Sequence, residues 1–222
     1  MGLDDYEGFD TRIDWPTGEL AAALALLPAG RALDLGCGHG TESLQLAAAG
    51  WNVVGIDREP SAIAEAERRR ERLGLPTSAA RFQRANALRY REPSPGRYSL
   101  VLDRLVFINL LHFRERQALL RTAAHALAPG GVFLLRWHFS PNGHGRADWA
   151  ARPWEQCSLT RTERRVAERW FRPARELPFT GLASPWEGTS DGSILHPTPM
   201  RMSLFALARN DTPPPGSPRR RR

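Results

Sequence analysis

The feature that most constrains the fold is a short apolar run that leads directly into a cluster of glycines. Arg31 to Leu35 is apolar-rich, and glycine then occupies alternate positions in the segment Gly36 to Gly40. A second apolar run, Asn52 to Ile56, follows Thr41 to Ala49, whose leucines and alanines favour a helix. Gly50 stands where the C-terminal cap of that helix belongs. The pattern predicts two buried parallel strands joined by a helix.

The same alternation continues along most of the chain. Apolar runs and apolar residues at helical spacing predict further elements, namely helices over 61–73, 113–127 and 160–171 and strands over 80–83, 98–102, 132–137 and 200–208. Pro129-Gly130-Gly131 is expected to end the helix over 113–127. Alternating strands and helices are typical of an α/β protein with a parallel sheet between helical layers. We expect a single domain over residues 1–209.

The composition of the chain limits the kinds of molecule that it is expected to bind. All 31 basic residues are arginine, against 24 acidic residues, and Arg219 to Arg222 form a terminal basic run. This run lies in segment 210–222, which contains prolines but no apolar anchor and is predicted to be a disordered tail. The other arginines are scattered, which argues against a nucleic-acid surface. Because no apolar run is long enough to span a membrane and residues 1–10 are acidic, we expect a cytoplasmic protein.

Several kinds of site are disfavoured by the residues present. A chain without lysine cannot contain a Gly-Lys-Ser/Thr phosphate loop, and Thr41 after Gly40 breaks the Gly-x-Gly-x-x-Gly fingerprint of nicotinamide dinucleotides. Cys37 and Cys157 are expected to be free thiols, because a chain with a full core has little need of a disulfide. The histidines do not have a zinc-binding spacing, so no metal is expected.

The glycine cluster and an acidic residue together predict a nucleoside site. Glycine lets the main chain turn sharply and approach a ligand where a β-carbon would collide. Asp57 ends the second predicted strand, where a carboxylate can accept both hydroxyls of an adenosine ribose.

Four segments resemble the class I S-adenosylmethionine-dependent methyltransferases. They are Ala32–Gly40, Val53–Asp57, Tyr98–Asp103 and Leu127–Gly131, in the order of that family. The resemblance covers roughly residues 30–137 and implies a Rossmann-like three-layer sandwich, with a mostly parallel seven-stranded sheet whose last strand is antiparallel. It also implies S-adenosylmethionine as cofactor and S-adenosylhomocysteine as product. The short architecture is similar to the thiopurine and tellurite methyltransferase branch.

The resemblance also implies roles for individual residues. Gly36, Gly38 and Gly40, with Cys37 between them, would lie under the methionine and ribose portions of the cofactor. Asp57 would bind the ribose, Arg58 would flank the adenine, and Asn86-Ala87 would contact the adenine amino group. Asp34 would organise the loop, although it could simply cap the following turn, and Asp103 would lie near the methionine. Catalysis by Cys37 is not expected, since nothing near it in sequence would lower the pKa of the thiol.

The sequence gives fewer indications of the residues that would contact the methyl acceptor than of those that would bind the cofactor. His138 could remove a proton from the acceptor; the other interpretation is a partly buried histidine that is bonded to backbone. An N-terminal lid and helix over residues 1–28 could fold over the site, or the aromatic residues of this segment could simply pack against the domain. The predicted substrate-side residues are Tyr6, Arg12, Trp15, Arg104, Trp137 and His138.

We therefore expect a methyltransferase that acts on a small-molecule acceptor by direct displacement. An RNA methyltransferase is one alternative, and a partner subunit that binds the cofactor without catalysis is another. The sequence does not indicate the oligomeric state.

Overall fold

The structure is a computed structural model, and it describes Leu24 and residues 27–104, 106–139, 161–173, 184–185 and 201–210. The strands are β1 (Arg31–Leu35), β2 (Asn52–Asp57), β3 (Ala80–Arg84), β4 (Tyr98–Asp103), β5 (Leu127–Phe139), β6 (Phe171–Pro173), β7 (Ser184–Pro185) and β8 (Arg201–Arg209). The helices are α2 (Thr41–Ala48), α3 (Pro60–Arg72), α4 (Phe113–Ala126) and α6 (Arg161–Trp170), with a 3-10 turn, η2 (Phe107–Asn109). None of these helices is both long and apolar enough to cross a membrane.

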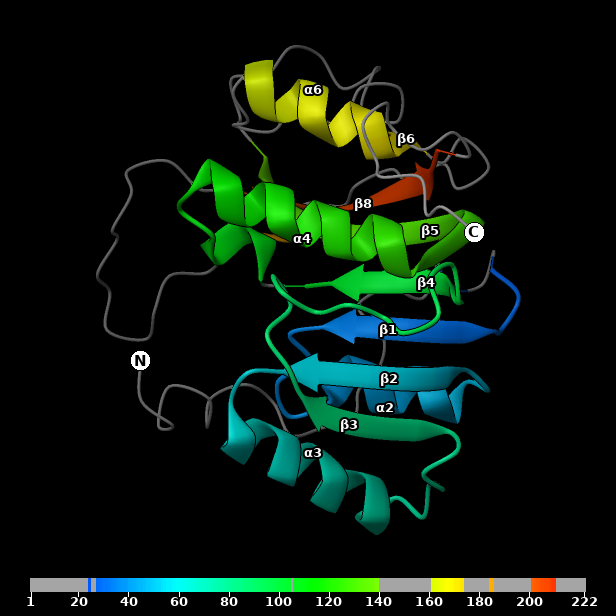
Figure 1. Cartoon of the computed structure of the whole chain (residues 1–222). Helices are drawn as coiled ribbons and strands as arrows, with labels where there is room; N and C mark the ends of the chain where they lie inside the picture. The colour runs from blue at the N-terminus through cyan, green and yellow to red at the C-terminus, as the bar shows by residue number, and fades with distance from the viewer. Residues whose placement is uncertain are drawn as a thin grey trace.

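The strands form one mixed sheet in the order β3-β2-β1-β4-β5-β8-β6, and the two-residue β7 pairs beside β8. β1 to β5 are parallel, and β8 runs antiparallel to β5. In Figure 1, α4 lies in front of the sheet and α2 behind it. The expected Rossmann-like α/β sandwich is confirmed. Its main path has seven neighbouring strands, and the last strand in the chain, β8, is antiparallel.

Alternate residues of the strands build two cores, one on each face of the sheet. On one face, Leu33, Val54 and Val101 pack with α4 and α6. On the other, Ala32, Val53, Leu100 and their neighbours pack with α2 and α3. Because successive side chains of a strand point to opposite faces, continuous apolar runs such as β1 satisfy both cores at once.

Most predicted boundaries agree with the structure to within two residues, but β5 is longer than expected. It pairs with β4 at Tyr98↔Leu127 and again at Leu100↔Val132, with an irregularity between the two pairs. Pro129-Gly130-Gly131 therefore lies in this irregular part of the strand, where Gly130 has φ 72°, and α4 already ends at Ala126. The strand also continues to Phe139, because antiparallel β8 pairs along its whole far end.

Two other expectations differ from the structure or fall outside it. The helix predicted over 160–171 ends at Trp170, since Phe171 begins β6 and pairs with Arg209. β6 and β7 were not predicted. The N-terminal lid over residues 1–28 and the tail over 210–222 lie almost entirely outside the described residues.

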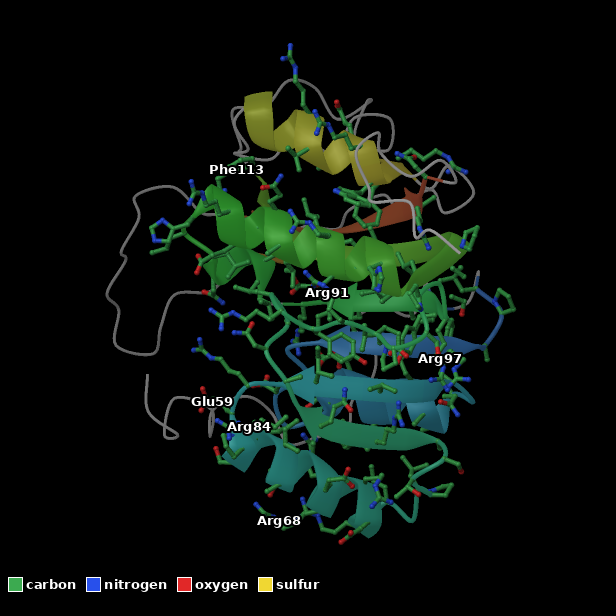
Figure 2. The ribbon with its side chains drawn as sticks, in the orientation of Figure 1. Glu59, Arg68, Arg84, Arg91, Arg97 and Phe113 are labelled. Carbon is green, nitrogen blue, oxygen red and sulfur yellow. The ribbon has the colours of Figure 1, made fainter. Side chains whose placement is uncertain are left out.

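A buried carboxylate anchors the end of the sheet where β4 begins. One oxygen of Glu92 accepts hydrogen bonds from the hydroxyls of Tyr90 and Tyr98, both at 2.8 Å, and Arg97 lies 3.5 Å from the other. Burial alone would raise the pKa of Glu92, but the hydrogen bonds from Tyr90, Tyr98 and the Ser94 backbone, together with the charge of Arg97, lower it. Figure 2 shows Arg97 at this edge of the sheet, opposite the edge that carries Glu59 and Arg84.

We predict that Tyr98→Phe destabilises the protein by about 1–3 kcal/mol, because it removes a donor from a buried carboxylate. Tyr90→Phe removes the same kind of bond from a half-buried ring and should cost less. Urea unfolding of both variants measures the difference. Equal losses would show that burial does not determine the strength of these bonds.

Candidate cofactor-binding site

The carboxyl ends of β1 to β4 meet at one edge of the sheet (Figure 1). The glycine loop, residues 36–40, follows β1, and Asp57 ends β2. Asn86 lies just beyond β3, and Asp103 ends β4. In open α/β sheets ligands bind at this edge, so the fold brings the predicted cofactor residues to the expected place.

Backbone hydrogen bonds hold the glycine loop over the end of β2. The N–H groups of Gly36 and Cys37 both donate to the carbonyl of Ile56, at 2.8 and 2.9 Å. The N–H of Gly40 then donates to the carbonyl of Cys37 at 2.9 Å, immediately before α2 begins. The main chain thus reverses within five residues.

The three glycines of the loop all have positive φ, but their surroundings differ. A β-carbon on Gly36 would lie 2.1 Å from Val106 Cγ2, and one on Gly40 would lie 2.8 Å from the ring of Phe82. A β-carbon on Gly38 would meet none of the described residues within 4 Å. Packing therefore explains Gly36 and Gly40, whereas within the described part of the chain Gly38 leaves room for a ligand to approach.

Asp57 links the glycine loop to the end of β2. Its Oδ2 accepts the N–H of Gly38 at 3.0 Å, and its Oδ1 accepts the N–H of Glu59 at 2.9 Å. The side chain is partly exposed, and each oxygen keeps a second lone pair. This arrangement suits the two neighbouring hydroxyls of a ribose.

The residues predicted to surround the adenine lie beside this carboxylate. Asn86 is exposed, and its Oδ1 accepts the N–H of Leu88 at 2.9 Å, which leaves one acceptor site for a ligand. Arg58 is 79% exposed and pairs with Glu59 at 3.2 Å. Arg84 donates to the carbonyl of Arg58 at 3.2 Å, so the end of β3 is joined to the end of β2.

Asp34 and Asp103 have their oxygens engaged inside the protein. Asp34 is 2% exposed and accepts the hydroxyl of Ser43 at 2.7 Å. Asp103 is fully buried and accepts the N–H groups of Val106 and Phe107, at 2.8 and 2.9 Å. Asp34 thus joins α2 to β1, and Asp103 binds the backbone at the start of η2.

Burial raises the pKa of the Asp34 carboxyl to about 8. The carboxylate of Glu42 adds to this rise, and the hydrogen bond from Ser43 opposes it. Burial also raises the pKa of the Cys37 thiol, with further contributions from Asp34 and Asp57. Cys37 is only 6% exposed and therefore stays a neutral thiol, which is unsuited to nucleophilic attack.

Two contacts of the site were not anticipated from the sequence. Arg104 forms an ion pair with Glu42 of α2, and Arg69 of α3 donates to the hydroxyl of Thr41 at 2.9 Å. Glu42 and Arg104 are 62 positions apart, and no local pattern joins them. Among the described residues, no three acids, histidines or cysteines are grouped so that they could hold a metal ion.

The remaining predicted site residues are only partly placed. Trp137 and His138 lie within β5, paired with Ser203 and Met202, so His138 does not follow the strand as expected. Their side chains are outside the description, and so are Tyr6, Arg12 and Trp15 altogether.

Comparison with known proteins finds similarity to methyltransferases over part of the chain. Residues 32–131 match the family described as a methyltransferase domain. Hemagglutinin 1 of Eikenella corrodens is 33% identical over 105 residues, which are 47% of this chain and 33% of that protein. An uncharacterized methyltransferase of Synechocystis sp. is 30% identical over 112 residues, 50% of this chain and 49% of that protein. The chain thus spans half or less of these relatives.

The structure of TehB from Haemophilus influenzae has the same fold. It is 18% identical, with a TM-score of 0.60 over 87% of this chain and 62% of TehB.

We predict that Asp34→Asn flattens the dependence of stability on pH. Because the pKa of Asp34 is higher in the folded protein than its ordinary 3.8, the folded state keeps a proton that the unfolded chain releases between these values. Stability from this group is thus lost as pH rises from about 4 to 8, on the order of 1 kcal/mol per pH unit. Asparagine is neutral throughout and still accepts the Ser43 hydroxyl. Urea unfolding at pH 5, 6, 7 and 8 tests this, and parallel pH profiles would contradict it.

Proposed function

We propose that this chain, whose residues 32–131 match the family described as a methyltransferase domain, is a class I S-adenosylmethionine-dependent methyltransferase that transfers the methyl group of the cofactor to a small-molecule acceptor. The observation that carries the proposal is the pairing of Asp57 with Gly38. This pairing sets a partly exposed carboxylate beside Gly38, where a β-carbon would meet none of the described residues. When bound, S-adenosylmethionine supplies a methyl group on a positively charged sulfur, which an acceptor displaces directly.

The residues present fit this cofactor. Asp57 accepts the ribose hydroxyls, and Asn86 and Ala87 meet the adenine beyond the end of β3, with Arg58 at its flank. The order of the strands then directs the methionine portion toward β1 and β4, where Asp34 and Asp103 lie. Gly36, Cys37 and Gly40 shape the loop, and Gly38 lets the cofactor approach.

The protein mainly aligns the two reactants and excludes water, because the displacement disperses charge and does not require a base. An acceptor hydroxyl or protonated nitrogen would need one, and we assign that role to His138. Trp137 would border the acceptor, and Tyr6, Arg12 and Trp15 would close over it. Arg104 is engaged by Glu42, so its part in the site is indirect.

A small acceptor is favoured by the absence of any second recognition unit in the described residues, which form one sheet with its covering helices. Two alternatives are an enzyme that methylates RNA and a partner subunit that binds the cofactor without catalysis. The assays described below distinguish both of them from a small-molecule methyltransferase.

We predict that Asp57→Asn weakens the binding of S-adenosylmethionine about 10–100-fold, because the side chain loses its charge and one of its two acceptor oxygens becomes an NH2 donor. Isothermal titration measures the dissociation constant. The matched control is Glu59→Gln, which neutralises the next acidic side chain, itself 59% exposed and paired only with Arg58 in the hydrogen bonds and ion pairs described. The control should bind normally, and equal weakening in both variants would refute the ribose assignment.

The function itself is tested by titrating the protein with S-adenosylmethionine, S-adenosylhomocysteine and NAD. We expect binding of the first two alone. Methyl transfer from labelled cofactor is then assayed with thiols, phenols, amines and tRNA. Transfer to a small molecule supports the proposal, transfer to tRNA alone contradicts the acceptor class, and binding without any transfer favours the partner role.

A further inference from the structure

The first turn of α2, which follows the glycine loop, is held by side chains from other elements. Arg69 of α3 donates to the hydroxyl of Thr41 at 2.9 Å and to the carbonyl of His39 at 3.1 Å. The hydroxyl of Ser43 donates to Asp34 of β1 at 2.7 Å. Two neighbouring elements thus fix both sides of this turn.

Between these two contacts, Glu42 is paired with Arg104, the residue that follows β4. The side chain of Glu42 is 14% exposed and that of Arg104 is 31% exposed, so the pair is partly shielded from water. A shielded ion pair is screened less by salt than an exposed one, and a break in it leaves an unpaired charge beside the loop.

The turn after β4 is itself rigidly placed against the glycine loop. Asp103 accepts the N–H groups of Val106 and Phe107, which fixes the course of the chain beyond Arg104. Val106 occupies the space that a β-carbon on Gly36 would need. The ion pair and this packing therefore lock the glycine loop to the end of β4 at two points.

The same region carries an excess of acidic groups. Glu42 and Asp103 both act on the buried carboxyl of Asp34 and raise its pKa, while Arg104 lowers it. Without Arg104, the carboxylate of Glu42 would lie unneutralised beside Asp34. Without Glu42, an unpaired guanidinium would lie at the loop. Either change alters both the position and the charge of this end of the loop.

We propose that the Glu42–Arg104 ion pair holds the glycine loop in position for the methionine half of the cofactor, with Arg104 as a positioning residue that acts through Glu42. The inference rests on the proposed function. The order of the strands indicates which half of the cofactor the ion pair affects. Asp57 on β2 binds the ribose, with β3 and the adenine on one side of β2. The ion pair lies on the opposite side of β2, beyond the ends of β1 and β4, where the methionine half belongs.

The test compares two uncharged-sulfur ligands that differ in the amino-acid portion. S-adenosylhomocysteine carries it, and 5′-methylthioadenosine does not. We expect Glu42→Gln and Arg104→Gln each to weaken S-adenosylhomocysteine about tenfold and 5′-methylthioadenosine less than about twofold in isothermal titration. Arg104→Lys, which keeps the charge, should recover part of the lost affinity.

Arg68→Gln is the matched control, because Arg68 pairs with Glu65 at 2.9 Å on α3, away from the loop (Figure 2). It should change the affinity for neither ligand. Equal weakening of both ligands by the Glu42 and Arg104 variants, or no weakening of either, would overturn the inference while leaving the proposed function intact. Failure of the unaltered protein to bind either ligand would overturn both.

Discussion

The parallel pairing of β1 with β2 on one side and β4 on the other is the constraint on which the rest of the structure depends. Asp34 of β1 is opposite Gly55 on one side and Leu102 on the other, so the three strands end together. The glycine loop, Asp57 and the turn after β4 consequently leave the sheet at one edge. In this register Leu35 pairs with Ile56, and the N–H groups of Gly36 and Cys37 donate to the carbonyl of Ile56.

The acidic residues at this edge have different roles, and the role of each depends on how deeply its side chain is buried. Asp34 and Asp103 are shielded from water and bind groups of the protein itself, so they fix α2 and the turn after β4. Asp57 is partly exposed and keeps free lone pairs beside Gly38, so it is the carboxylate suited to a ligand. A rigid base and one accessible carboxylate are what preorganised binding of a ribose requires.

Much of the fold could be predicted from the sequence, because apolar runs, and the glycines that end strands and helices, are local properties of the chain. The glycine loop and Asp57 could be predicted for the same reason. The β4–β5 irregularity could not, since it depends on how two strands pair, and neither could the short β6, which exists only through β8. The Glu42–Arg104 pair joins residues distant in sequence, and only the strand order brings them together.

Cofactor binding at the carboxyl edge of β1 to β4, through Asp57, is the assignment on which the proposed activity rests. The most direct test is a crystal structure of the protein with S-adenosylhomocysteine. We expect the ribose hydroxyls within hydrogen-bonding distance of both oxygens of Asp57, with the ligand against Gly38 and its amino-acid portion toward β4. A ligand bound at another edge, or with its ribose away from Asp57, would refute the assignment of Asp57.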